Sequence, residues 1–155
     1  MAEFVLESFS NARTMYNPNA SRFGKYTELQ FSDHGRLDSV KTLDYYLERN
    51  RVASPPSGER NFHIFYYLLA GASQEERQHL HLLDKATYHY LGTHHRPLGR
   101  DEDTVCFEQL KIALKNIGLS KRHVTQTCQL FAAILHLGNI DFIHNRHRNE
   151  GAAVV

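Results

Sequence analysis

The sequence has no excess of either charge: 18 lysines and arginines are set against 17 aspartates and glutamates, which leaves +1 with neutral histidines. Such a balance provides no overall field that would draw the chain to nucleic acid or to a membrane surface. The sequence also has no apolar run long enough to span a bilayer, and its N-terminus lacks the basic-then-apolar order of a signal peptide. We therefore expect a soluble, cytoplasmic segment that contacts neither nucleic acid nor membrane.

Cysteine is scarce, and no metal-binding spacing is present. Cys106 and Cys128 stand alone without a CxxC pattern, and each falls in a segment with helical periodicity. Both are expected to be small buried thiols in a reducing, intracellular compartment. The 11 histidines include three close pairs, none with a carboxylate or cysteine at ligand spacing: His79 with His81 on one helix, His94 with His95, and His144 with His147. We expect no structural zinc site, and we expect His63 and His136 to be packed or hydrogen-bonded rather than catalytic.

The length and the apolar content are enough for one domain, since 155 residues with 41% apolar content can bury a core. Residues 4–9 have the apolar pattern of the end of a helix, and a polar loop occupies residues 10–25. Residues 26–31 alternate as a strand, and turn-forming residues at 32–35 lead into a return strand at 36–43. Two strands alone form no stable sheet in water, so they need a helical cover or neighbours outside the chain.

The second part of the chain has helical patterning after the break at residues 54–58, SPPSG. Its signals are an apolar stripe (Phe62, Phe65, Tyr66, Leu69), a capping box (Ser73, Glu76), a second stripe (Phe107, Leu110, Leu114, Ile117) ended by Asn116 and Gly118, and a last helix capped by Ser120. Residues 92–100 form a polar connector. The chain is therefore predicted to be α/β and mostly helical, a two-stranded fragment of sheet followed by at least four helices.

The loop NPNASRFGK, residues 17–25, has an unusual density of polar groups. A hydroxyl such as that of Ser21 suits Mg²⁺, which prefers oxygen ligands. Asn17 and Asn19 carry amide donors for phosphate oxygens, and Arg22 has a planar fork that pairs with a carboxylate or a phosphate. The alternative from residue types alone is an ordinary surface loop, in which the Asn and Ser side chains form local turns and Arg22 is solvated.

The amino-acid sequence of this loop resembles switch I of the myosin motor domain, whose usual pattern is N-x-N-S-S-R-F-G-K. Three further phrases resemble the same family in its order: VLESFSNART at 5–14, GERNFHIFYYLLAG at 58–71 and FAAILHLGNIDF at 131–142. Within that family, residues 27–73 are most similar to fungal chitin synthases with an N-terminal myosin-like motor ahead of a membrane-embedded glycosyltransferase. The resemblance places such a parent in the plasma membrane or in secretory vesicles.

The resemblance implies a partial P-loop NTPase motor fold with ATP and Mg²⁺ as cofactors. Asn17 would contact the nucleotide and Asn19 its phosphates, Ser21 would ligate Mg²⁺, and Arg22 would pair with a glutamate of switch II. Residues 10–25 would be switch I, residues 26–43 strands of the central sheet, residues 59–142 the upper actin-binding subdomain, and residues 143–155 the truncated start of the next segment. The implied partners are actin filaments and the remainder of the motor and synthase.

The sequence departs from the family pattern in several places. Ala20 stands where the pattern has the first of two serines, whose hydroxyl lies close to the terminal phosphate, and this counts against fast hydrolysis. The P-loop G-x-x-x-x-G-K-[ST], the switch II phrase and the glycosyltransferase signatures are missing, so Arg22 is expected to lack a partner within the chain. We expect a fragment of a longer motor that does not hydrolyse ATP alone. The alternative is a stand-alone, non-enzymatic module that binds actin or another partner.

Overall fold

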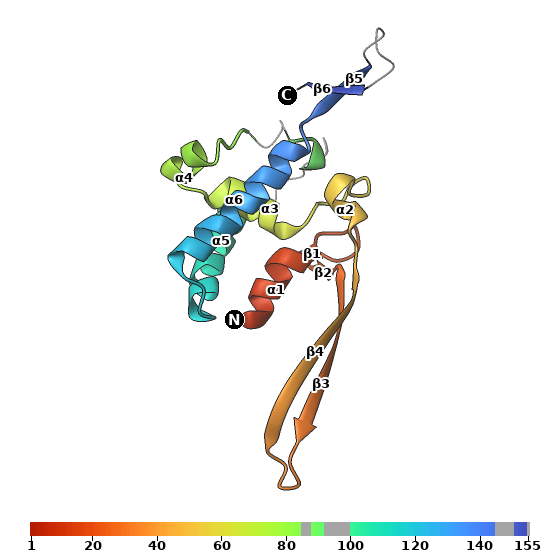
Figure 1. Ribbon diagram of the computed structural model, residues 1–155, viewed down its shortest axis with the longest axis vertical. Helices are drawn as coiled ribbons and strands as arrows, with labels where there is room; N and C mark the ends of the chain where they lie inside the picture. Colours follow the sequence, from red (N-terminus) through yellow and green to blue (C-terminus); the bar gives the residue numbers. More distant parts are fainter. Residues whose placement is uncertain (85–87, 92–99, 145–150, 155) are drawn as a thin grey trace.

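The computed structural model describes residues 1–84, 88–91, 100–144 and 151–154, and Figure 1 shows their arrangement. The predicted mixture of helices and strands is confirmed, with more residues in helices. The helices are α1 (Ala2–Ser10), α2 (Asn50–Ala53), α3 (His63–Gly71), α4 (Gln74–His79), η2 (His89–Leu91), α5 (Arg100–Asn116) and α6 (Lys121–Leu137). The strands are β1 (Asn11–Ala12), β2 (Ala20–Ser21), β3 (Phe23–Phe31), β4 (Leu37–Leu47), β5 (Asp141–His144) and β6 (Gly151–Val154), which pair as three two-stranded sheets. Among the described residues, no helix has the length and apolarity needed to cross a bilayer.

The long hairpin of β3 and β4 extends away from the helices, and β5 with β6 lies at the opposite end of the molecule (Figure 1). The pairing of β3 with β4 runs from Phe23 with Leu47 to Phe31 with Leu37. The tip is closed by a hydrogen bond from the Ser32 amide to the Arg36 carbonyl, 2.8 Å, beside a left-handed Gly35. Both predicted strands are therefore confirmed, and both are longer than the apolar alternation indicated.

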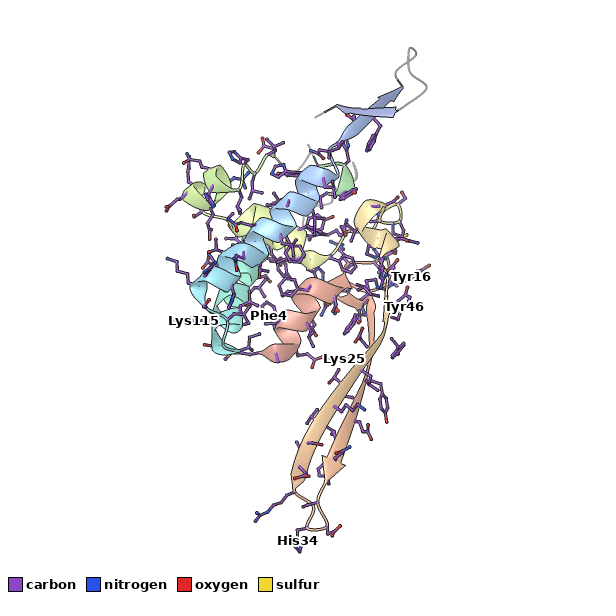
Figure 2. All side chains as sticks on the ribbon, viewed as in Figure 1. Phe4, Tyr16, Lys25, His34, Tyr46 and Lys115 are labelled. Carbon is purple, nitrogen blue, oxygen red and sulfur yellow. The ribbon has the colours of Figure 1, made fainter. Side chains whose placement is uncertain are left out.

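Among the residues that the structure describes, none covers the outer part of the hairpin. Every residue of β4 is exposed, and apolar side chains project into solvent from both strands, among them Leu29, Phe31, Leu37, Val40, Tyr45 and Tyr46. Figure 2 shows Tyr46 near the helical end of the hairpin and His34 at its far tip. A two-stranded ribbon is marginal without packing, so the stability of this chain comes from its helices.

Helix α3 lies at the centre of the core, between α1, α5 and α6. The predicted stripe is buried in full: Phe62, Phe65, Tyr66 and Leu69. Phe107, Leu110 and Leu114 of α5 pack in the same core region, as does Leu135 of α6. Each such side chain contributes about 1.5–3 kcal/mol of burial free energy, so these contacts, rather than helix propensity, hold the helices together.

Local signals set the helix ends as predicted. Ser73 and Glu76 form a reciprocal capping box at α4, and Ser120 Oγ accepts from the His123 amide at the start of α6. After α5, Gly118 takes φ 99° and the Leu119 amide donates to the Leu114 carbonyl at 3.1 Å, which is the geometry that favours glycine there.

Three sequence expectations need correction or fall outside the structure. Ile117 is 45% exposed, because it follows the last turn of α5, and is not a core residue. His81 is not on the helix of His79: α4 ends at His79 and His81 has a left-handed backbone, φ 52°. The connector at 92–99, with His94 and His95, and also His147, lie outside the described residues.

A close approach of two helices makes Gly71 sensitive to substitution. A Cβ at this position would lie 2.5 Å from Phe107 Cβ on α5. We expect Gly71→Ala to lower the free energy of unfolding by about 1–3 kcal/mol, because overpacking forces the helices apart. Urea denaturation measures the loss. Gly35→Asn is the control, since nothing lies within 4 Å of that site and Asn tolerates the left-handed region; equal losses at both sites would contradict the packing argument.

Candidate functional site

The polar loop is closed at its base by a short antiparallel pair. β1 and β2 align Asn11 with Ser21 and Ala12 with Ala20, and the Arg22 amide donates to the Ser10 carbonyl at 2.8 Å. Ala12 and Ala20 are buried, and Ala12 also bridges to Phe62 at the start of α3. The loop thus begins and ends on backbone that is attached to the core.

Within the loop, local hydrogen bonds form compact turns. The Thr14 amide donates to the Asn17 carbonyl at 2.9 Å, and the Asn17 amide donates to Thr14 Oγ1 at 3.0 Å. Asn17 Oδ1 accepts from the Asn19 amide at 2.9 Å, an Asx-type turn. The Asn17 side chain is exposed, and the neighbouring Tyr16, 96% exposed, projects into solvent (Figure 2).

The Asn19 side chain contacts three other segments. Its Oδ1 accepts from Asn11 Nδ2 at 3.0 Å and lies 3.2 Å from His63 Nε2, while its Nδ2 donates to Glu7 Oε2 at 3.2 Å. Burial, with a smaller contribution from the Arg60 charge, lowers the pKa of His63 to about 4. The imidazole is therefore neutral at pH 7, and a proton on Nε2 lets it donate to Asn19.

The contact between Asn19 and His63 borders a cavity of about 270 Å³ between α1, the loop, α3 and α5. Its walls include Asn19, His63, Tyr67, Glu102 and Cys106. Burial and the neighbouring Cys106 raise the pKa of Tyr67, so its hydroxyl stays protonated at pH 7. The His63 imidazole and the Tyr67 hydroxyl at this wall are consequently neutral hydrogen-bonding groups at pH 7.

Ser21 and Arg22 bond away from Asn19. Ser21 Oγ is exposed and donates to the Phe23 carbonyl at 3.0 Å. Arg22 Nη1 lies 3.4 Å from Glu48 Oε2, with both side chains half-buried, and Arg22 Nε is buried without a hydrogen-bond partner. The expectation that Arg22 lacks a partner within the chain is wrong, because the hairpin returns the chain so that Glu48 lies beside Arg22.

Glu48 continues into a network of charges. Arg51, 2% exposed, donates from Nε to Glu48 at 2.9 Å, from Nη2 to Glu59 at 2.7 Å and from Nη1 to the Arg60 carbonyl at 3.0 Å. Burial alone would raise the pKa of Glu48, but the hydrogen bonds and charges of Arg51 and Arg22 outweigh it and hold that pKa below its ordinary value. The loop is thereby connected electrostatically to the segment that precedes α3.

A buried ion pair joins that segment to α5. Arg60 Nη2 contacts both oxygens of Asp103, at 3.1 and 2.9 Å, and the two side chains are 6% and 3% exposed. The guanidinium carbon lies 3.7 Å from the centre of the Tyr66 ring, a cation–π geometry. No sequence signal links positions 43 residues apart, so sequence reasoning could not find this pair.

The comparison with known proteins assigns this arrangement to a family. The family model described as "Myosin head (motor domain)" matches residues 1–154. The chain belongs to the myosin head family. It is 56% identical over 154 residues to "Chitin synthase 8" of Mycosarcoma maydis and 50% identical over 155 residues to "Chitin synthase 5" of Cryptococcus neoformans, covering 99% of this chain and 8% of either protein. "Unconventional myosin heavy chain 6" of Caenorhabditis elegans is 40% identical over 147 residues, 94% of this chain and 7% of that protein.

The myosin-head loop therefore brings together only part of the predicted site. Asn17 and Asn19 are hydrogen-bonded to each other, whereas Ser21 and Arg22 bond with other partners. In the described residues, no cluster of three or more His, Cys, Asp and Glu side chains has the arrangement of a metal site. Sequence reasoning missed Glu7, Glu48 and Arg51, whose only signal is the proximity that folding creates.

The two predicted histidines behave as expected, whereas the two cysteines are less buried than predicted. His63 is buried and hydrogen-bonded, and His136 Nε2 lies 3.0 Å from the Leu80 carbonyl. Cys106 and Cys128 are free thiols on helices, though each is only partly buried. Burial raises the pKa of Cys128 to about 11, which keeps it a thiol at pH 7.

Proposed function

We propose that this chain supplies the nucleotide-sensing loop of a myosin-type motor that binds Mg-ATP. The observation that carries the proposal is the loop itself: its two ends are attached to the core, while the Asn17 side chain and the Ser21 hydroxyl remain exposed. A loop held at its base with exposed polar groups can close over a phosphate and open again after hydrolysis.

The residues present fit part of a Mg-ATP site. Ser21 would hold Mg²⁺ through its hydroxyl, and since Mg²⁺ takes few protein ligands its other positions belong to phosphate oxygens and water. Asn17 would donate an amide to the nucleotide. Arg22 retains a buried Nε without a hydrogen-bond partner beside Glu48, so this guanidinium has capacity for the second carboxylate that the family pattern assigns to switch II. When bound, Mg²⁺ would offset the negative charge of the phosphates.

In the parent protein, we propose that nucleotide binding is coupled to attachment to actin filaments, with residues 59–142 as part of the actin-binding half. The identity to two fungal chitin synthases supports a parent that moves or tethers a glycosyltransferase of the cell wall at the plasma membrane or in secretory vesicles. The chain spans 8% of those relatives, so turnover requires the phosphate-cradling P-loop and switch II from other segments.

A second proposal, an interaction module without enzymatic activity, draws on the hairpin. Its exposed apolar residues on both strands, with unpaired strand edges, form a surface that a partner can cover by strand addition. Native electrophoresis of the chain with actin filaments, with and without the hairpin tip mutated, distinguishes this use from a role that requires nucleotide.

The test of the nucleotide site uses a complete motor in which this chain replaces the matching segment of the 56% identical chitin synthase. We expect Ser21→Ala and Arg22→Ala to weaken Mg²⁺-dependent binding of a fluorescent ATP analogue about tenfold or more, because each removes a group that contacts or positions the metal–phosphate complex. Titrations with and without Mg²⁺ measure the effect.

Ser39→Ala is the matched control, because this serine is exposed on β4 and bonds only to Gln30. It should leave affinity unchanged. Unchanged nucleotide affinity and turnover in both the Ser21 and Arg22 variants would overturn the assigned roles.

A further inference from the structure

The amide of Asn19 has its acceptor capacity filled by the chain itself. Its oxygen has two lone pairs, and these face Asn11 Nδ2 at 3.0 Å and His63 Nε2 at 3.2 Å. One of its two amide hydrogens goes to Glu7 Oε2 at 3.2 Å. A side chain that is this fully engaged has a single amide hydrogen left for any ligand.

The three partners come from separate elements. Glu7 lies on α1, Asn11 begins β1, and His63 begins α3, 44 residues further along the chain than Asn19. The His63 ring is fixed in turn by stacking on Tyr67, with the ring centres 5.7 Å apart and the planes 9° apart. Asn19 thus joins the loop to two helices whose positions are set by the core.

We propose that Asn19 is a positioning residue, held by His63, Asn11 and Glu7, which fixes the end of the nucleotide loop and thereby the direction of Ser21. This role differs from the direct phosphate contact that the family resemblance implies for Asn19, and its effect on nucleotide rests on the function proposed above. Ser21 follows Asn19 by two residues, and Ala20 between them is buried in β2. A displacement of Asn19 therefore also displaces the hydroxyl of Ser21.

The first test needs no nucleotide. In the 155-residue chain, we expect Asn19→Ala to raise amide hydrogen exchange in a peptide covering residues 13–20 about tenfold, because it removes the contacts with Asn11, Glu7 and His63 together. We expect His63→Ala to raise this exchange by a smaller factor, because the contacts with Asn11 and Glu7 remain. The double variant should match Asn19→Ala, since the contact with His63 is already lost in that variant. Additive effects of the two substitutions, or unchanged exchange in both variants, would overturn the proposal.

Conservative variants separate anchoring from general loss of structure. His63→Gln retains a side-chain N–H donor and Glu7→Gln retains an acceptor oxygen, so both should restore protection of residues 13–20 relative to His63→Ala and Glu7→Ala. His79→Ala, exposed on α4 and bonded to Gln129, is the matched control and should change nothing in the loop. Where His63→Ala fails to fold, judged by its urea transition, Glu7→Ala gives the same reading, because this glutamate is only partly buried.

The second test uses the complete chimeric motor and distinguishes the two proposals. If anchoring is correct, both Asn19→Ala and His63→Ala weaken the Mg-dependent affinity for a fluorescent ATP analogue, Asn19→Ala by the larger factor. If Asn19 instead contacts phosphate, Asn19→Ala weakens binding while His63→Ala does not, and the anchoring role fails while the proposed function survives. If loop exchange responds as expected but no variant, Ser21→Ala included, changes affinity, the anchor stands and the nucleotide function fails.

Discussion

Replacing Asp103 with alanine is expected to lower the free energy of unfolding by about 3–5 kcal/mol. The substitution leaves the guanidinium of Arg60 buried without its carboxylate, and within the described part of the chain Nε and Nη1 of this arginine have no hydrogen-bond partner. The cation–π contact with Tyr66 offsets only part of that charge. Urea denaturation of the two chains, followed by helical circular dichroism, measures the difference.

Two comparisons make this result interpretable. Glu108→Ala removes an ion pair with Lys111 that is more exposed, and it should cost about 1 kcal/mol or less. The double variant Arg60→Met with Asp103→Leu should recover most of the loss, because an apolar pair of similar volume carries no desolvation penalty. A double variant as unstable as Asp103→Ala would show that the position itself, rather than the unpaired charge, is responsible.

The position of Arg60 explains why its buried ion pair with Asp103 is useful there despite the free energy that desolvation of the two charges costs. The Arg60 amide donates to the Arg13 carbonyl in the loop of residues 10–25 at 2.9 Å, and its carbonyl accepts from Arg51. The side chain reaches Asp103 on α5, so one residue joins the loop, the charge network of Glu48 and α5. An apolar residue would pack equally well, but it would not fix how these segments are aligned with one another. Buried charges serve that role in other proteins.

Short-range signals in the sequence were sufficient for the longer helices, but the short α2 and η2 were not predicted. The stripe that begins at Phe62 and the capping box of Ser73 and Glu76 depend on spacings of three and four residues, which chain geometry fixes wherever a helix forms. Of the strands, β3 and β4 were found without their outer ends, because β3 begins at Phe23 and β4 continues to Leu47, beyond the region of clear alternation. The short strands β1, β2, β5 and β6 were not predicted.

Long-range contacts were beyond such reasoning. The partner of Arg22 is Glu48, 26 residues away, and its proximity follows from the register of the hairpin rather than from any local pattern. Asn19 and His63 are likewise brought together only when α3 packs beside β1. The residue types of the loop were recognisable in the sequence, whereas the contacts of Asn19 with Glu7, Asn11 and His63 could be seen only in the folded chain.

The buried imidazole of His63 predicts acid sensitivity. Its pKa is about 4 in the folded chain against about 6.5 for an unperturbed histidine, so the unfolded chain binds a proton that the folded chain does not. Stability from this group is complete above pH 6.5 and is lost as the pH falls towards 4. Between pH 7 and pH 5 we expect a loss of about 2 kcal/mol from His63 alone. Urea midpoints across this range measure it.

His63→Gln isolates this contribution, because glutamine can donate to Asn19 without titrating. The difference in unfolding free energy between the two chains should shrink or reverse as the pH falls from 7 to 5, a range above the lowered pKa of Glu48. The charges nearest His63 act in opposite directions, since Arg60 disfavours its protonation and Asp103 favours it. Burial is the larger cause, so a chemical-shift titration of the His63 ring with a midpoint near 6.5 would show that the imidazole is hydrated and that the Asn19 anchor lies open to water.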